Sequence, residues 1–260
     1  MSDIDASFLD HALQIARKAA EAAEQVVARH YRAQYDIESK ADDSPVTIAD
    51  REAELAILGV LRLSFPDHAY YGEEYGRSGS SRFLWLIDPI DGTKSFVRRY
   101  PMFSTQIALM VDGALVLGVS SAMQYGECAW ARRGGGAFIN GSPVSCDTTR
   151  SLSAAQISTG NIKSLARDPR RWAALGAIVL DCNRIRGYGD FLHYHLLAAA
   201  AVDVVIESDI NILDIAALTV IAREAGAVFT DLQGLAIGLE TRSALAAAPQ
   251  LHGEILQRLG

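Results

Sequence analysis

The chain has 260 residues, half of them hydrophobic, and a formal net charge of −7 at pH 7. This length can supply a substantial core in one large domain or in two packed ones. The acidic balance argues against nucleic acid as the main partner, because phosphate backbones are bound by clustered lysines and arginines. No apolar stretch reaches the roughly 18 residues of a membrane span, and the N-terminus does not resemble a signal peptide. We therefore expect no membrane association and a cytoplasmic location.

Two helices are predicted in the first 65 residues. Apolar residues recur near the helical period from residue 5 to residue 35. A polar segment, predicted to be a loop, follows them. Thr47 and Asp50 have the spacing of a capping box, which predicts a second helix from near Thr47 to just before Pro66.

Short apolar runs separated by Gly, Pro and Ser come next and are typical of strands. We predict strands over 69–74 and 83–88. Two hairpins follow, with turns at Asp112-Gly113 and Asn140-Gly141, because these dipeptides favour tight hairpin turns.

Beyond residue 145 the predicted helices and strands alternate. Strands are expected over 154–159, 176–181, 202–207 and 227–231, and helices over 189–201, 212–226 and 249–259. This pattern favours a layered α+β architecture with two sheets. We expect an N-terminal half, residues 1–145, and a C-terminal half, residues 146–260.

The segment LWLIDPIDGTKSF, residues 84–96, ends a buried apolar run on two carboxylates. Asp88 and Asp91 stand in a turn constrained by Pro89, so both side chains can converge on one point. Gly92 allows close approach of the backbone to a ligand, and Thr93 adds a hydroxyl. Two hard oxygen ligands in a tight turn suit Mg²⁺.

Two further acids extend this candidate metal site. Glu73 ends the predicted strand 69–74, and Asp214 lies in the predicted first turn of helix 212–226. A carboxylate at a helix N-terminus is stabilised in its charged form, as a metal ligand must be. Repulsion among four clustered acids would require bound cations to offset it.

Three motifs in this order, GEE at 72–74, DPIDGT at 88–93 and LDIAAL at 213–218, resemble the inositol monophosphatase-like phosphatases. The resemblance extends from about residue 8 to the C-terminus. It implies a layered α-β-α-β-α sandwich of the inositol monophosphatase and fructose bisphosphatase type. It also implies phosphomonoester hydrolysis with two or three Mg²⁺ ions, inhibition by Li⁺, and a homodimer.

The resemblance assigns roles to individual residues. It implies metal ligation by Glu73, Asp88, Asp91, Asp214 and the carbonyl of Ile90, and phosphate binding by the main chain at Gly92 and Thr93. Water activation falls to Thr93 with Glu73 and Asp50, although Asp50 could equally serve only the helix start. Leu213 departs from the family, which usually has Trp there.

The segment from Arg186 to Glu207 is expected to line the substrate side. A Gly-Asp at 189–190 followed by aromatic residues looks most like the histidinol-phosphate phosphatase branch. Asp190 and Glu207 could pair with the ammonium or imidazole of that substrate, although Asp190 could instead only cap its own helix. Two alternatives stay open: another small phosphate ester such as inositol phosphate, and a metal-binding regulatory protein without turnover.

Overall fold

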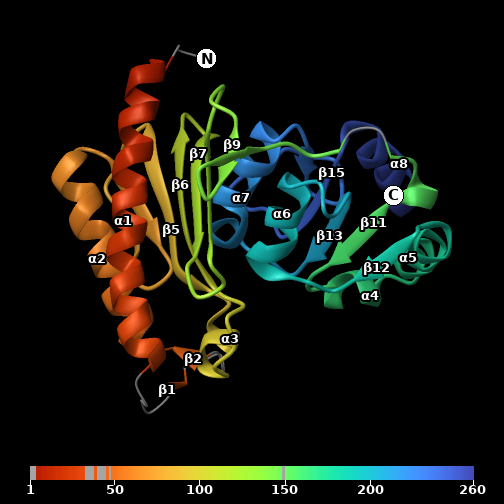
Figure 1. Ribbon diagram of the computed structural model, residues 1–260, viewed down its shortest axis with the longest axis horizontal. Helices are drawn as coiled ribbons and strands as arrows, with labels where there is room; N and C mark the ends of the chain where they lie inside the picture. Colours follow the sequence, from red (N-terminus) through yellow and green to blue (C-terminus); the bar gives the residue numbers. More distant parts are fainter. Residues whose placement is uncertain (1–3, 33–37, 40–44, 47, 148–149) are drawn as a thin grey trace.

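Five layers, helices alternating with sheets, make up the computed structural model of the chain (Figure 1). It describes residues 4–32, 38–39, 45–46, 48–147 and 150–260. Helices α1 (Ala6–Arg32) and α2 (Ile48–Ser64) form the first layer. They pack as a pair against one face of the first sheet, and their alanines and branched residues share one core with it. The predicted α-β-α-β-α order is confirmed.

The first sheet has eight strands in the order β10-β9-β8-β7-β6-β5-β3-β4. All neighbours are antiparallel except β3 and β5. Both predicted hairpin turns are confirmed, since Asp112 and Asn140 each adopt φ of 49° ahead of their glycines. The strands are β3 (Ala69–Gly72), β4 (Gly76–Ser78), β5 (Phe83–Asp91), β6 (Ser104–Val111), β7 (Ala114–Ala122), β8 (Glu127–Arg132), β9 (Ala137–Ile139) and β10 (Ser142–Val144).

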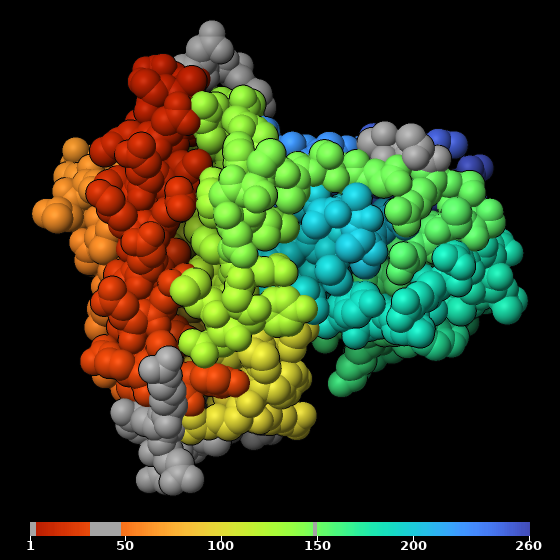
Figure 2. Space-filling view, in the orientation of Figure 1, coloured from red at the N-terminus to blue at the C-terminus, as the bar shows by residue number. Residues whose placement is uncertain are grey.

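The second sheet is mixed, in the order β12-β11-β13-β15-β14. Its strands are β11 (Gln156–Thr159), β12 (Arg184–Arg186), β13 (Val204–Ser208), β14 (Val228–Thr230) and β15 (Ser243–Ala247). Helices α4 (Lys163–Arg167), α5 (Pro169–Asp181) and α8 (Pro249–Leu259) cover its outer face with a separate apolar core. In the space-filling view the green-to-blue C-terminal segments lie at the right, and the yellow-green strands of the first sheet separate them from the red helix α1 (Figure 2).

Helices α6 (Asp190–Ala198) and α7 (Ile212–Glu224) form the central layer between the two sheets. Helix α7 lies directly on β7. A Cβ added to Gly118 would come within 2.3 Å of the Ala217 carbonyl oxygen, so only glycine allows this approach. The contact fixes the position of α7 relative to the first sheet.

Short elements complete the fold. Strands β1 (Glu38–Ser39) and β2 (Pro45–Val46) pair with each other, and α3 (Thr93–Val97) follows β5. No helix in the described part of the chain combines the length and apolarity needed to cross a membrane.

One predicted strand is wrong: residues 176–181 belong to helix α5. Asp168 caps this helix by accepting the N–H groups of Arg170 and Arg171, and Pro169 occupies its first turn. The apolar run is split between two faces, since Ile178 is buried whereas Leu180 is 87% exposed. Thr47, at the predicted start of the second helix, lies outside the described residues.

Candidate active site

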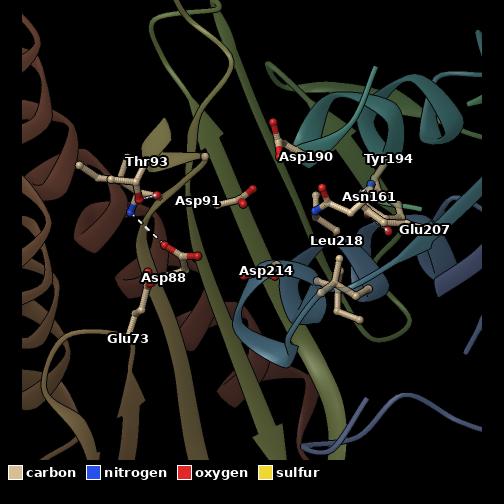
Figure 3. Close-up of a pocket in the computed structure, with 14 residues that line it drawn as sticks. Glu73, Asp88, Asp91, Thr93, Asn161, Asp190, Tyr194, Glu207, Asp214 and Leu218 are labelled. Atoms are coloured by element: carbon tan, nitrogen blue, oxygen red, sulfur yellow. Dashed lines mark hydrogen bonds between the residues drawn. The ribbon is translucent and has the colours of Figure 1, made fainter. Parts of the chain in front are cut away.

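A cavity of about 120 Å³ lies between the end of β5 and the central helices (Figure 3). Its wall combines acidic residues from both sheets and from α6 and α7 with a few apolar side chains. The lining residues are Glu73, Asp88, Ile90, Asp91, Gly92, Thr93, Asn161, Asp190, Tyr194, Glu207, Ile210, Asp214, Ile215 and Leu218.

Asp88 and Asp91 face the cavity together because β5 contains a bulge. Residues three apart in a regular strand point to opposite faces of the sheet. Asp88 pairs with Gln106 and Asp91 pairs with Ser104, so three steps on β5 match two on β6. The extra residue turns both carboxylates to the α7 side. Asp88 Oδ1 also accepts the Ile90 N–H at 3.0 Å, which fixes the turn.

Asp214 reaches the same point from the first turn of α7. Together with Asp88 and Asp91 it offers carboxylate oxygens that all lie within 4.8 Å of one another. Asn211 caps the helix through a capping box: its side chain accepts the Leu213 N–H, and Asp214 Oδ2 accepts the Asn211 N–H at 2.8 Å. Asn211 is not among the site residues predicted from the sequence, although Asn before an apolar helix is a recognised start signal.

The three clustered carboxylates are poorly solvated and repel one another. Burial raises the pKa of Asp88 and of Asp91 well above the usual value, and the neighbouring acids raise both further. Burial is also the main reason that the pKa of Asp214 rises to about 7, against the lowering effect of its bonds to Asn211. A cation at this point would remove the repulsion, so the donor set fits a divalent metal.

These pKa shifts predict how stability depends on pH. An acid whose pKa is raised by folding binds its proton more tightly in the folded than in the unfolded chain. The metal-free protein should therefore lose stability as the pH rises from about 4, the unfolded value, to about 7. Metal ligands must be deprotonated, so the rise in melting temperature caused by Mg²⁺ should grow between about pH 5 and about pH 8. A constant or shrinking rise, measured by scanning calorimetry, would contradict this.

Thr93 begins α3 at the edge of the cavity. Its hydroxyl donates to the Ile90 carbonyl at 3.0 Å and lies 3.5 Å from Asp50 Oδ1. Asp50 stands in the first turn of α2 and is buried. Gly92 has φ of 90°, and a Cβ there would lie 2.6 Å from the Met102 carbonyl oxygen. The turn that presents Thr93 thus requires glycine.

Glu73 lines the cavity but stands outside the group of three carboxylates. Glu54, a buried residue that was not predicted from the sequence, binds the backbone of the loop that carries Glu73. Glu54 accepts the N–H groups of Glu74 at 2.7 Å and Tyr75 at 3.2 Å. Gly72 leaves room for this carboxylate, since a Cβ would lie 1.9 Å from Glu54 Oε1.

A second acidic pair, Asp190 and Glu207, lines the opposite side of the cavity. Glu207 accepts hydrogen bonds from the Tyr194 hydroxyl at 2.9 Å and the Asn161 N–H at 3.2 Å, and His193 Nε2 lies 3.2 Å from it. Burial, followed by the charge of Glu207, raises the pKa of Asp190 to about 6. Tyr194 lies one turn after Asp190, a spacing that could have identified it from the sequence.

Asp190 does not cap α6. Gly189 is the N-cap residue, and no side chain makes a capping hydrogen bond there. The carboxylate of Asp190 is thus placed in the cavity without a role in the helix start. Arg186, expected on the substrate side, is exposed on β12 and is not among the residues that line the cavity. Leu213, the departure from the family, is buried in the core of the central layer.

Comparison with known proteins agrees with this geometry. The sequence profile described as the inositol monophosphatase family matches residues 8–260. A histidinol-phosphatase of Mycobacterium tuberculosis is 40% identical over 86% of this chain and 87% of its own length. The Nus factor SuhB of Pasteurella multocida is 35% identical over 95% of each chain. The solved inositol monophosphatase of Anabaena superposes with a TM-score of 0.84 at 28% identity, covering 96% of each chain. Because the family profile covers residues 8–260 and the relatives share the fold and most of its length, the chain belongs to the inositol monophosphatase family.

Proposed function

We propose that this protein is a Mg²⁺-dependent phosphomonoesterase that hydrolyses histidinol phosphate to histidinol and phosphate, a step of histidine biosynthesis. The observation that carries the proposal is the pairing of two acidic groups in one cavity. The cluster of Asp88, Asp91 and Asp214 suits metal ions, and Asp190 with Glu207 stands opposite it. Family membership and the similarity to histidinol-phosphatases support the phosphatase class.

Glu73, Asp88, Asp91, Asp214 and the Ile90 carbonyl would hold the metal, two or three ions in all. When bound, Mg²⁺ polarises the phosphoryl oxygens and lowers the pKa of water. The protein itself supplies position. The bulge in β5 and the cap of α7 hold their carboxylates in place before any ligand arrives, so little reorganisation is needed on binding.

Thr93 and Asp50 would orient the attacking water. The Thr93 hydroxyl would accept a hydrogen bond from the water. To pass a proton on to the buried Asp50 carboxylate, 3.5 Å away, it would turn its own hydrogen from the Ile90 carbonyl to Asp50 as it takes the proton of the water. The N–H groups around Gly92 and Thr93 would bind the phosphate. Glu73, at the rim, completes the set of groups near the water.

Asp190 and Glu207 would select the substrate. A buried ammonium or imidazolium needs an anionic partner, and a cavity with two carboxylates beyond the metal cluster offers one. The two bonds from Tyr194 and Asn161 keep Glu207 facing the cavity. A neutral polyol phosphate would bring no cationic group to this acidic pair.

Phosphate release from a substrate panel tests the proposal. We expect turnover of histidinol phosphate that depends on Mg²⁺, stops with chelator, and exceeds turnover of inositol phosphate. A preference for inositol phosphate would replace histidinol phosphate as the proposed substrate. No release from any ester with Mg²⁺ present would favour a metal-binding regulatory protein, an alternative that the similarity to Nus factor SuhB keeps in view.

Lithium provides a further prediction. Li⁺ should inhibit at millimolar concentration by competing with Mg²⁺ near Asp91 and Asp214, as the family resemblance implies. Raising the Mg²⁺ concentration should weaken the inhibition if the two ions compete for one site. Insensitivity at tens of millimolar would weaken the assignment at Asp214, where Leu213 is the neighbouring departure from the family. A homodimer and a cytoplasmic location belong to the same proposal.

A further inference from the structure

A row of buried hydrogen bonds leads from Asp91 through the first sheet to helix α6. Ser104 Oγ donates to Asp91 Oδ2 at 3.3 Å, and Gln106 Nε2 donates to Ser104 Oγ at 2.7 Å. Gln106 Nε2 also donates to Ser120 Oγ at 3.0 Å, which lies 2.9 Å from His195 Nε2. Each of these side chains is at least 92% buried. None of the residues beyond Asp91 has a part in the proposed chemistry.

Strand register places these residues side by side. Ser104 and Gln106 are two apart on β6 and so share the face turned to the central helices. Ser104 is the register partner of Asp91 on β5, and Gln106 is the partner of Ser120 on β7. The row therefore crosses three neighbouring strands and ends on an imidazole supplied by α6.

Counting donors favours one direction for every bond in the row, the direction in which each hydroxyl hydrogen has an acceptor. Gln106 uses its two amide hydrogens on Ser104 and Ser120, so each hydroxyl accepts one bond and has one hydrogen left to donate. The hydrogen of Ser104 goes to Asp91, and that of Ser120 goes to His195 Nε2. His195 then carries its proton on Nδ1, which lies 3.0 Å from Glu127 Oε2.

The opposite orientation of the Gln106 amide is disfavoured. Its Oε1 is buried without a hydrogen-bond partner among the described residues. Exchanging Oε1 and Nε2 would point the oxygen at both hydroxyls and leave two buried N–H donors unpaired. One unpaired carbonyl oxygen costs less than two unpaired donors. The serine hydroxyls are therefore directed away from Gln106, one toward Asp91 and one toward His195.

We propose that Gln106 is a positioning residue for the metal site, acting on Asp91 through Ser104. Gln106 directs the Ser104 hydroxyl to Asp91 Oδ2, and this bond restrains the rotation of the Asp91 carboxylate within the cluster with Asp88 and Asp214. Ser104 is the one side-chain donor that Asp91 has in the described part of the chain. The inference rests on the metal site of the proposed function but not on its substrate.

Mg²⁺ affinity of the metal-free protein, measured by titration calorimetry, tests the role of the row. Ser104→Ala and Gln106→Met should each weaken binding by about 10-fold to 100-fold, as loss of groups that orient metal ligands commonly does. The double variant should be little worse than either single one, because both act through one bond to Asp91. Thr219→Val is the matched control. It removes a buried hydroxyl that bonds to Ile215 within α7, outside the row, and should leave Mg²⁺ affinity unchanged.

The tautomer of His195 tests the direction of the bonds without any metal. Nitrogen-15 NMR of the wild-type protein, with signals assigned through His195→Gln, should find the proton on Nδ1 and a bare Nε2. A proton on Nε2 would overturn the inference, as would unchanged Mg²⁺ affinity in both folded variants. If the wild-type protein binds no Mg²⁺, the proposed function fails, and the tautomer still decides whether the row has this direction.

Discussion

Asp88→Asn should reduce Mg²⁺-dependent phosphate release by about 1000-fold or more, since loss of an anionic ligand removes roughly 4 kcal/mol of transition-state stabilisation. The asparagine oxygen can still accept the Ile90 N–H, so the turn in β5 should survive. The substitution thus changes the charge at the site and little else. Phosphate release with and without Mg²⁺ measures the effect.

The same variant should be more stable than wild type without metal. Burial and the charges of Glu73, Asp91 and Asp214 all raise the pKa of Asp88, so its ionised form is unfavourable in the metal-free fold. Asp112→Asn is a suitable control, because Asp112 is exposed in a hairpin turn with φ of 49°, which asparagine tolerates. The control should retain full activity. A large fall in the melting temperature of metal-free Asp88→Asn would contradict the electrostatic argument.

Asp190→Asn should lower kcat/KM for histidinol phosphate by 10-fold to 100-fold, about 1.5 to 3 kcal/mol for one charge-assisted hydrogen bond. The expected cause is loss of the anion that faces the substrate's cationic group. Asparagine suits this position, because Asp190 has φ of 46° and asparagine tolerates the left-handed region as aspartate does. Asp190→Ala would add backbone strain and obscure the result.

Inositol phosphate supplies the comparison for this variant. It has no amine, so its turnover should barely change in Asp190→Asn. An equal loss for both substrates would mean general damage to the cavity, and no loss for either would remove Asp190 from substrate recognition. The ratio of the two kcat/KM values is therefore the quantity to measure.

The sequence predicted the layers and the acids of the site because both are encoded locally. The spacing of Asp88, Pro89 and Asp91 indicated convergence, and the structure explains it by a bulge that no local pattern reveals. Asp214 was placed correctly on the first turn of its helix. Its partner Asn211 could have been recognised by the same reasoning.

Features that depend on pairing between distant segments were not predictable. Strand β15 has the sequence SALAA, whose alanines carry little strand preference, and it exists because β13 and β14 pair with its two edges. Residues 176–181 resemble a buried strand in sequence, whereas in α5 only Ile178 of this run is buried and the other five residues are exposed. No sequence motif points to Glu54 or Gln106, because their roles depend on the residues that the fold places beside them.

The direct contact between α7 and β7 at Gly118 has a consequence for how this scaffold can diverge. The distance from Asp214 to the acids on β5 depends on a backbone contact, which side-chain replacement cannot easily adjust. Helix α6, in the same layer, meets the cavity through the side chains of Asp190 and Tyr194. If Asp214 and Asp190 act as proposed, residues on α6 can be exchanged to alter substrate preference while α7 keeps the metal geometry constant. Similar chains carry names as different as histidinol-phosphatase and Nus factor SuhB, as expected if α6 tolerates more substitutions than α7.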